Sequence, residues 1–309
     1  MKKYEGISRE GFYIRPMVQR VWDVQLDMLK EIDRVCRKYG IRWYVDWGTL
    51  LGTVRHKGYI PWDDDLDISM MRLDFERFKK NAMKELPQEY VCQIDRGNEL
   101  KDLVFRIKNQ EMISTDPVAL EKNHGCPYIV GIDIFVYDNI PDDLTERDQY
   151  LAMFTYAFAA AADPTPDMLF EECSDETKEL IRKTEYMTGI NIDRSRPVKS
   201  ILVALADHIA AMYYDTETAE IAHTCFLPHD RKYAFLKEWF LETEYKDFEE
   251  IQVPVPKGYD KVLTRLYGED YMIPHRRYMH NYPYFENQEQ ALFSWFNSKQ
   301  LDIPDDFRE

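Results

Sequence analysis

The chain has 309 residues, of which 45% are hydrophobic, so it can bury a sizeable core and is long enough for one large domain. A formal net charge of −16 opposes binding of nucleic acid or of an anionic membrane through the overall electrostatic field. The chain has no apolar run of about 18 residues, and no apolar segment follows its N-terminal lysines. It therefore predicts neither a transmembrane helix nor a secretory signal.

The cysteines are scattered and odd in number: Cys36, Cys92, Cys126, Cys173 and Cys225. Because they form no C-x-x-C pair, the sequence argues against a disulfide framework or a zinc ribbon. A reducing compartment suits such thiols, and we expect a cytoplasmic protein.

An amphipathic helix is predicted for residues 17–38, followed by a strand at residues 42–46. Basic residues and then Gly40 mark the end of the helix. The strand, RWYVD, is rich in bulky aromatic and β-branched residues. The apolar positions of the helix have helical spacing: Val21, Val24, Met28, Ile32 and Val35.

A second helix is predicted to begin at Gly48 and Thr49. Glycine lets a phosphate approach the backbone, Thr49 can offer a hydroxyl and an amide, and first-turn amides carry the positive end of the helix dipole. Arg55 and Lys57 close this helix with positive charge. They either contact the same phosphate or only complement the helix dipole.

A strand with paired acids is predicted after Pro61, at residues 65–70 (DLDISM). Its alternation places Asp65 and Asp67 on one face. Two like charges about 4 Å apart repel by roughly 4 kcal/mol at an effective dielectric of about 20. A divalent cation would relieve this repulsion, and hard oxygen ligands beside a phosphate favour Mg²⁺ (or Mn²⁺) over zinc.

Further along the chain, the patterns predict a helix at residues 75–86 and strands at 90–94 and 103–109. Arg106 and Lys108 lie two residues apart on the last of these strands, so they share a face. That face either reaches the phosphates or is solvated.

The strand predicted for residues 128–141 carries Asp133 among apolar residues. A charge on a half-buried strand needs a partner because an unpaired buried charge is costly. A metal site would supply this partner, so Asp133 is predicted to join Asp65 and Asp67 as the third carboxylate.

Together with the elements above, the remaining chain predicts an α+β fold with a mixed sheet flanked by helices. Helices are predicted at residues 144–162, 175–188, 197–214 and 259–267, with short strands within 233–256 and a partly helical tail past 280. We expect three parts: a catalytic core at 1–144, a mostly helical insertion or subdomain at 145–230, and a C-terminal segment at 231–309 that completes the domain.

Two groups of residues have both a functional interpretation and an ordinary structural one. The aromatic rings near the acids could hold a quaternary ammonium by cation–π attraction, but a chain with 14% aromatic residues favours ordinary core packing for them: Trp43, Trp47, Tyr59 and Trp62. An H-x-C-x₃-H string lacks the partner cluster that zinc needs, so structural roles are favoured for its members: His223, Cys225 and His229.

A helix opened by Gly-Thr, an Asp-x-Asp strand and a later strand Asp together resemble the nucleotidyltransferase fold. The wording GTLLGTVRHKGYIPWDDDLDI at residues 48–68 resembles the signature of the LicD family, the phosphorylcholine transferases, whose relatives include the fukutin-type ribitol-phosphate transferases. The resemblance resumes at residues 132–141 and 253–272. The middle, roughly 145–230, shows no resemblance.

This resemblance implies a Mg²⁺-dependent phosphotransferase. It would move a phosphorylated alcohol, with phosphocholine favoured, from CDP-choline or another CDP-alcohol to a sugar hydroxyl of a cell-surface glycan or glycolipid such as lipopolysaccharide or teichoic acid. Any encounter with a membrane-linked acceptor would be peripheral. The implied metal ligands and catalytic acids are Asp65, Asp67 and Asp133, and the implied substrate-binding residues are Gly48, Thr49, Arg55, Lys57 and Arg106.

Two alternatives remain open. One keeps the fold but uses a nucleoside triphosphate donor for nucleotidyl transfer to a small molecule or a protein. The other is a catalytically silent member of the fold that binds a glycan or a partner protein through the helical insertion. The identity of the donor, and whether any donor is turned over, distinguishes the three.

Overall fold

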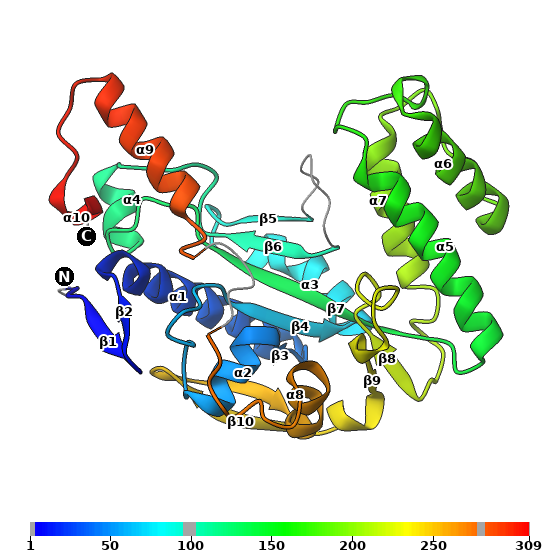
Figure 1. Cartoon of the computed structure of the whole chain (residues 1–309), viewed down its shortest axis with the longest axis horizontal. Coiled ribbons are helices and arrows are strands. Elements are labelled where there is room, and N and C mark those ends of the chain that lie inside the picture. The colour runs from blue at the N-terminus through cyan, green and yellow to red at the C-terminus, as the bar shows by residue number, and fades with distance from the viewer. Residues whose placement is uncertain (1–3, 95–102, 277–281, 309) are drawn as a thin grey trace.

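The computed structural model describes residues 4–94, 103–276 and 282–308, and its centre is one mixed β-sheet (Figure 1). The strands follow the order β3-β4-β7-β6-β5, with β8 paired to β7 and β9 paired to β8. Their bounds are β3 Tyr44–Val45, β4 Asp67–Met71, β5 Val91–Ile94, β6 Phe105–Lys108, β7 Gly131–Asn139, β8 Glu220–Ala222 and β9 Ala234–Leu236.

The two strands at the centre of the sheet, β4 and β7, are parallel, and their register sets Asp67 opposite Asp133. The other strand pairs are antiparallel. Successive side chains of a strand point to opposite faces, so Ile132 and Ile134 occupy the face opposite Asp133 and are fully buried. One face of the sheet is therefore core, and the other carries the acids.

Three helices cover this sheet near its centre: α1 Pro16–Tyr39, α2 Trp47–Arg55 and α3 Arg72–Glu85. Helices α1 and α3 contact each other and β7, whereas α2 contacts β4 and the strand β10 (Thr243–Phe248) of a C-terminal hairpin. The long helix α1 ends at Tyr39 and is capped by Gly40. The left-handed backbone of Gly40 (φ 60°) is most easily adopted by glycine. The short helix α4, Pro117–Lys122, precedes β7.

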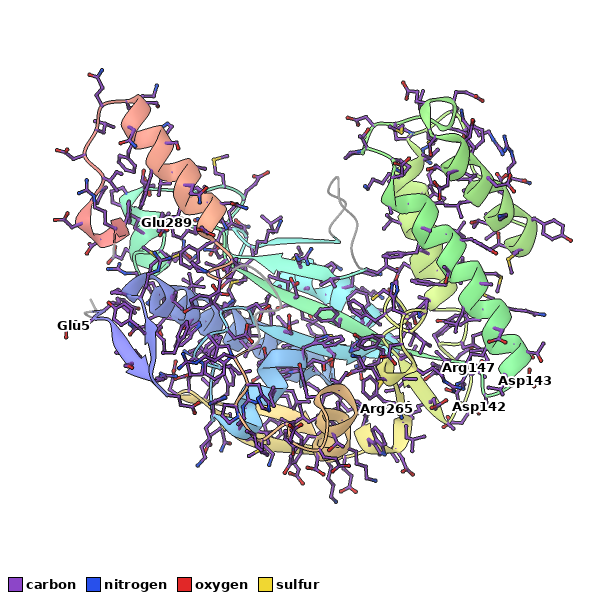
Figure 2. All side chains as sticks on the ribbon, in the orientation of Figure 1. Glu5, Asp142, Asp143, Arg147, Arg265 and Glu289 are labelled. Atoms are coloured by element: carbon purple, nitrogen blue, oxygen red, sulfur yellow. The ribbon has the colours of Figure 1, made fainter. Side chains whose placement is uncertain are left out.

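A helical unit made of α5 Leu144–Ala162, α6 Asp175–Thr188 and α7 Val198–Ala210 rises from one end of the sheet (Figure 1). Its apolar side chains form a hydrophobic cluster of their own. Asp143 caps α5 by accepting hydrogen bonds from two first-turn amides. Arg147 donates to the Pro141 carbonyl and to Glu220 of β8, so the base of α5 is tied to the sheet (Figure 2).

A buried ionic network connects the helical unit with α3 and the sheet. Arg72 of α3 donates to both carboxylate oxygens of Asp138 on β7, at 2.6 and 3.1 Å, and to Asp207 of α7 at 2.8 Å. Thr224 donates to the same Asp138 carboxylate. Breaking such a pair leaves a buried charge without compensation, so this network holds α7 against the sheet.

The C-terminal part returns to the sheet and to the N-terminal helix. It comprises the hairpin β10 Thr243–Phe248 with β11 Ile251–Pro256, followed by α8 Tyr259–Tyr267, α9 Glu286–Ser298 and α10 Asp305–Arg308. Glu289 of α9 pairs with Arg15 just before α1 (Figure 2). A small N-terminal hairpin, β1 Ile7–Arg9 with β2 Phe12–Ile14, completes the fold.

The predicted α+β fold with a mixed sheet is confirmed, and α5, α6 and α8 have the predicted bounds. One local prediction was wrong: the strand expected at residues 65–70 begins only at Asp67, so Asp65 lies in the preceding loop. Strand pairing, which alternation alone does not reveal, begins at Asp67. The region 145–230, expected to be mostly helical, also contains β8, which extends the sheet.

Candidate active site

The site is built around the first turn of α2. Asp46 caps this helix, because its carboxylate accepts a hydrogen bond from the Trp47 amide at 2.8 Å. Its own amide donates to the Asp67 carbonyl at 3.0 Å, which fastens the end of β3 to the start of β4. Trp47 has a left-handed backbone (φ 44°), a costly conformation for a residue with a bulky side chain.

Thr49 connects α2 with the acidic strand. Its hydroxyl accepts a hydrogen bond from the Asp67 amide at 2.9 Å, and the residue is only 4% exposed. We predicted Thr49 as a phosphate-binding residue, and the structure shows that its hydroxyl also holds the backbone of Asp67 in place.

Gly48 is closely covered by the acidic loop. A Cβ built on Gly48 would lie 2.5 Å from Oδ2 of Asp63, which is too close for any non-glycine residue without movement of the carboxylate. Asp63 had no clear role in the sequence. The structure places its carboxylate directly against the first turn of the helix that was expected to receive a phosphate.

The carboxylates of this region strongly influence one another. Asp67 is 8% exposed and stands in register with Asp133 on the adjacent parallel strand. Burial, and then the charges of neighbouring acids, raise the pKa of Asp67 well above its usual range; the largest of these charges are those of Asp65, Asp133, Asp63 and Asp46. The site therefore concentrates negative charge in a poorly hydrated place.

Asp133 forms a bidentate ion pair with Arg106, with Nε–Oδ1 at 2.8 Å and Nη2–Oδ2 at 2.9 Å. The two residues face each other on β6 and β7, and about a quarter of each side chain is exposed. The structure thus brings Arg106 to the predicted site, where its guanidinium binds the third carboxylate.

A divalent metal such as Mg²⁺ requires several oxygen ligands close together. Within residues 4–94, 103–276 and 282–308, no three His, Cys, Asp or Glu side chains are grouped to hold a metal ion as they stand. The chemistry nevertheless fits a hard cation, because Asp67 and Asp133 stand opposite each other on adjacent strands and because the charges of Asp65 and Asp133 add to burial in raising the pKa of Asp67. The three-carboxylate ligand set stays a prediction.

The two cations expected after the phosphate-binding turn lie at the other end of α2. Arg55 donates hydrogen bonds to the Tyr271 carbonyl at 2.8 Å and to the His56 ring. Burial lowers the pKa of Arg55, and the charge of Asp63 partly opposes this shift. Lys57 is exposed in the turn after the helix. The structure therefore groups Gly48, Thr49 and Arg106 with the acids, places Arg55 at the border and leaves Lys57 outside.

Sequence reasoning missed His223. Its Nε2 lies 3.0 Å from Oδ2 of Asp46, its Nδ1 lies 3.3 Å from the Val136 carbonyl, and its ring stacks on Trp47 with 5.1 Å between centroids. The H-x-C-x₃-H string drew attention to this residue only as a zinc ligand. Local sequence carries no signal for a contact with the cap of α2.

Tyr267 at the end of α8 was also missed. Tyr267 is 38% exposed as a residue, but desolvation of its phenol, and then the charges of Asp46, Asp63, Asp67 and Asp65, raise the pKa of Tyr267 above its usual value. It therefore stays protonated beside the acids at neutral pH and can donate a hydrogen bond. The only available hint was its position in the C-terminal segment of the family resemblance.

The aromatic residues near the acids divide into two sets. Trp43, Tyr59 and Trp62 are buried in the main hydrophobic core, as the ordinary interpretation predicted. Trp47 differs, because it is partly exposed and contacts rings from distant segments: Phe135, Phe226 and Tyr233.

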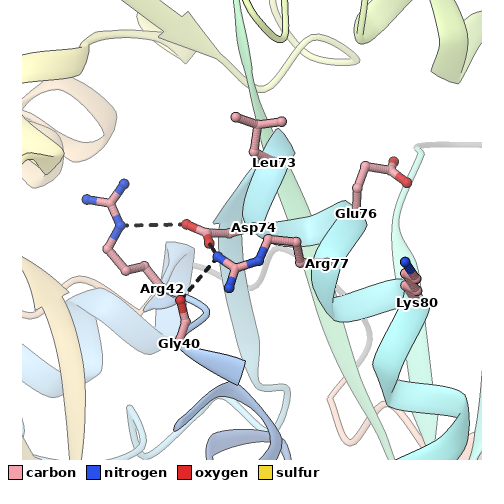
Figure 3. Close-up of a pocket in the computed structure, with 7 residues that line it drawn as sticks. All are labelled: Gly40, Arg42, Leu73, Asp74, Glu76, Arg77 and Lys80. Carbon is pink, nitrogen blue, oxygen red and sulfur yellow. Dashed lines mark hydrogen bonds and ion pairs between the residues drawn. The ribbon is translucent and has the colours of Figure 1, made fainter. Parts of the chain in front are cut away.

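An open pocket elsewhere on the surface is unrelated to these acids. Arg42, Asp74 and Arg77 line it and are held by an Arg42–Asp74 ion pair and by bonds from Arg77 to Asp74 and the Gly40 carbonyl (Figure 3). It lies beside α3, which follows the C-terminal end of β4, whereas Asp67 begins that strand. Its two carboxylates, Asp74 and Glu76, lie among the basic residues Arg42, Arg77 and Lys80, and we assign the pocket no part in the site.

Comparison with known proteins supports the same region. Residues 40–162 match the model of the family described as LicD/FKTN/FKRP, nucleotidyltransferase domain. The chain is 25% identical over 256 residues to the lipopolysaccharide cholinephosphotransferase LicD of Haemophilus influenzae, and the match covers 81% of this chain and 89% of that protein. Asp65, Asp67 and Asp133 lie inside the matched residues 40–162, whereas His223 and Tyr267 lie outside them.

Two shorter matches involve uncharacterized proteins. The chain is 47% identical over 130 residues to one from Rickettsia prowazekii, which covers 42% of this chain and 41% of that protein. It is 36% identical over 131 residues to one from Rickettsia typhi, which covers 42% of this chain and 34% of that protein. Among the described residues, no helix is both long enough and apolar enough to cross a bilayer.

Proposed function

We infer that this chain, whose residues 40–162 form a LicD-family nucleotidyltransferase domain, is a phosphotransferase that moves phosphocholine from CDP-choline to a sugar hydroxyl of a cell-surface glycan or glycolipid. The observation that carries the proposal is the pairing of Asp67 with Asp133 beside the capped start of α2. The similarity to LicD over 89% of that protein favours phosphocholine as the group and lipopolysaccharide as the acceptor.

The start of α2 would receive the donor diphosphate. First-turn amides and the helix dipole favour an anion there, and Gly48 removes the side chain that would block its approach. Asp63 now covers this glycine, so we propose that its carboxylate moves aside when the diphosphate enters. Arg106 would neutralise phosphate oxygens from the neighbouring strand.

Mg²⁺ is the proposed cofactor, held by Asp65, Asp67 and Asp133. When bound, it would neutralise charge on the diphosphate and on the departing CMP. The protein residues would then position the reactants and stabilise charge. The hydrogen bond from the Asp67 amide to the Thr49 hydroxyl keeps the strand carboxylate aligned with the helix start.

Asp133 has a second possible role, as the base that accepts the proton of the acceptor hydroxyl. The acceptor would approach from solvent, because about a quarter of the Asp133 side chain is exposed. We propose that the enzyme acts in the cytoplasm, because its five scattered cysteines form no C-x-x-C pair and suit reducing conditions, and that it meets a membrane-linked acceptor only peripherally.

A second candidate function follows from the description of the matched family domain. A nucleotidyltransferase would take a nucleoside triphosphate as donor and release pyrophosphate rather than CMP. The same acids and helix start would serve this reaction, and the two functions differ in the donor, the leaving group and the acceptor, which would be a small molecule or a protein.

A donor screen tests the proposal. The full chain is incubated with Mg²⁺ and either CDP-choline, CDP-ethanolamine, CDP-ribitol or each nucleoside triphosphate, with lipopolysaccharide as acceptor, and released CMP and pyrophosphate are measured. We expect CMP from CDP-choline, lost with EDTA and in Asp67→Asn. Pyrophosphate release from a triphosphate would favour the second function, and no release from any donor would refute both.

A further inference from the structure

We propose that the partly exposed rings of Trp47, Phe226 and Tyr233 form the subsite that recognises a quaternary ammonium group. The inference rests on the proposed function and names the part of the chain that would distinguish choline from other alcohols. Phe226 and Tyr233 lie outside the matched residues 40–162.

The three rings form a triangle. Their centroids are 5.3 Å (Trp47–Phe226), 5.7 Å (Trp47–Tyr233) and 5.5 Å (Phe226–Tyr233) apart, and the planes are inclined to one another by 47 to 77°. A cation seated over this triangle comes within about 6 Å of all three centroids, the range of cation–π attraction. Each ring is only partly buried, so the triangle is accessible to a ligand.

The triangle contacts a ring that lies on the same face of the sheet as Asp133. Phe135, whose ring contacts both Trp47 and Phe226, follows Asp133 by two residues on β7, so both side chains point to the same face of the sheet. Two residues of strand advance about 6.6 Å. The Phe135 ring thus lies between the acids and the triangle, with its centroid 5.6 Å from that of Trp47 and 6.2 Å from that of Phe226.

The fold holds Trp47 in a conformation that is unfavourable in free energy. Its backbone is left-handed (φ 44°), and its buried indole nitrogen has no hydrogen-bond partner among the residues that the structure describes. His223 stacks on the indole and also binds Asp46, which caps α2. Such costs persist where the surroundings dictate a conformation, and they concentrate at functional sites.

The chemistry of the triangle favours a quaternary ammonium over a primary one. The nearby carboxylates attract a cation, while ring faces offer no strong hydrogen-bond acceptors for an N–H group. One of the rings already attracts a cation, because Lys232 Nζ lies 5.1 Å from the Tyr233 centroid. Lys232 is 40% exposed, so it can move into solvent when a ligand arrives.

The test compares dissociation constants for CDP-choline and CDP-ethanolamine, measured by calorimetry on the full chain with Mg²⁺. We expect the wild-type protein to prefer CDP-choline by about tenfold or more, and Phe226→Leu and Tyr233→Leu each to reduce this preference by about three- to tenfold. Tyr233→Phe, which keeps the ring, retains the preference. Trp295→Leu, at a 46% exposed tryptophan on α9, serves as the matched control and changes nothing.

The outcomes separate the two proposals. If the wild-type protein binds and turns over CDP-choline but shows no preference over CDP-ethanolamine, or if folded leucine variants keep the preference, the aromatic subsite is refuted and the proposed function stands. If the wild-type protein neither binds nor turns over any CDP-alcohol, the proposed function fails and the subsite fails with it.

A second measurement covers leucine variants that do not fold. Tetramethylammonium chloride is added to the wild-type protein, with sodium chloride at the same ionic strength as control. We expect tetramethylammonium to weaken the binding of CDP-choline more than that of CDP-ethanolamine, because it occupies the site of the trimethylated group. Equal effects of the two salts on both donors would overturn the subsite.

Discussion

His223 and Asp46 are 177 positions apart in the chain, and their side chains meet at 3.0 Å with about 1% of each exposed. The other ring nitrogen of His223 lies 3.3 Å from the Val136 carbonyl, so both nitrogens face oxygen atoms. This buried pair ties the segment after β8 to the residue that caps α2. The helix start is therefore positioned by a residue far outside the nucleotidyltransferase signature.

Replacement of His223 by alanine is expected to lower the free energy of unfolding by about 3 to 5 kcal/mol, because it leaves the Asp46 carboxylate buried without its partner. Urea unfolding measures this loss. His275→Ala is the control, since its pair with Asp270 is more than half exposed and worth about 1 kcal/mol at most. Equal stabilities of the two variants would show that the buried pair contributes nothing.

Asp67→Asn is expected to reduce CMP release at least about 100-fold, because a carboxamide binds Mg²⁺ poorly. The unfolding free energy should stay within about 1 kcal/mol of wild type or rise, since the amide removes a buried charge from among other acids. Asp302→Asn, at an exposed position in the C-terminal tail, is the control. Full activity in Asp67→Asn would contradict the metal-ligand assignment.

Gly48→Ala tests the anion-binding turn. The added Cβ would lie 2.5 Å from the Asp63 carboxylate, so we expect the KM for the donor to rise by about tenfold or more. The double variant Gly48→Ala with Asp63→Ala separates two explanations. If the donor phosphate itself needs the glycine, activity stays low; recovery would show that only the clash with Asp63 mattered.

Arg106→Met tests the competition for Asp133. A guanidinium and a metal ion bind the same carboxylate oxygens, so removal of Arg106 should tighten Mg²⁺ binding by about three- to tenfold. At the same time, the KM for the donor should rise, because a charge that faces the phosphates is lost. Calorimetric titration with Mg²⁺ alone measures the first effect, and unchanged or weaker binding would argue that Asp133 is not a ligand.

The pH dependence of the free energy of unfolding should show whether the fold lowers the pKa of His56. Burial, and then the charge of Arg55, lower the pKa of His56 below 6.5, and the Arg55 guanidinium donates to its Nε2, which keeps the ring neutral. The unfolded chain then binds a proton more readily than the folded protein. This contribution to stability is complete above about pH 6.5 and is lost as the pH falls below that value.

The variant His56→Gln should therefore lose less stability than wild type when the pH is lowered from about 7.5 to 5.5. Thermal unfolding at both pH values measures the difference. His208→Gln, on α7, is a control for a histidine elsewhere in the fold. An identical pH dependence in wild type and His56→Gln would show that the His56 pKa is not lowered by the fold.

Local order along the chain was predictable from the sequence. Helical spacing of apolar residues predicted α1, α5, α6 and α8 to within a few residues, because each of these helices buries one stripe. The aspartates and Gly-Thr of the 48–68 segment, together with Asp133, predicted the acidic site and its anion-binding turn. These features are short-range patterns, and short-range patterns are what a single sequence displays.

Strand pairing and the contacts between distant segments were decided only by the tertiary structure. The register of β6, β4 and β7 sets Arg106 against Asp133 and Asp133 beside Asp67. The return of the chain after the helical unit sets His223 on Asp46 and Phe226 on Trp47. Such contacts depend on which elements pack together, and a residue's own neighbours in the chain carry no record of that choice.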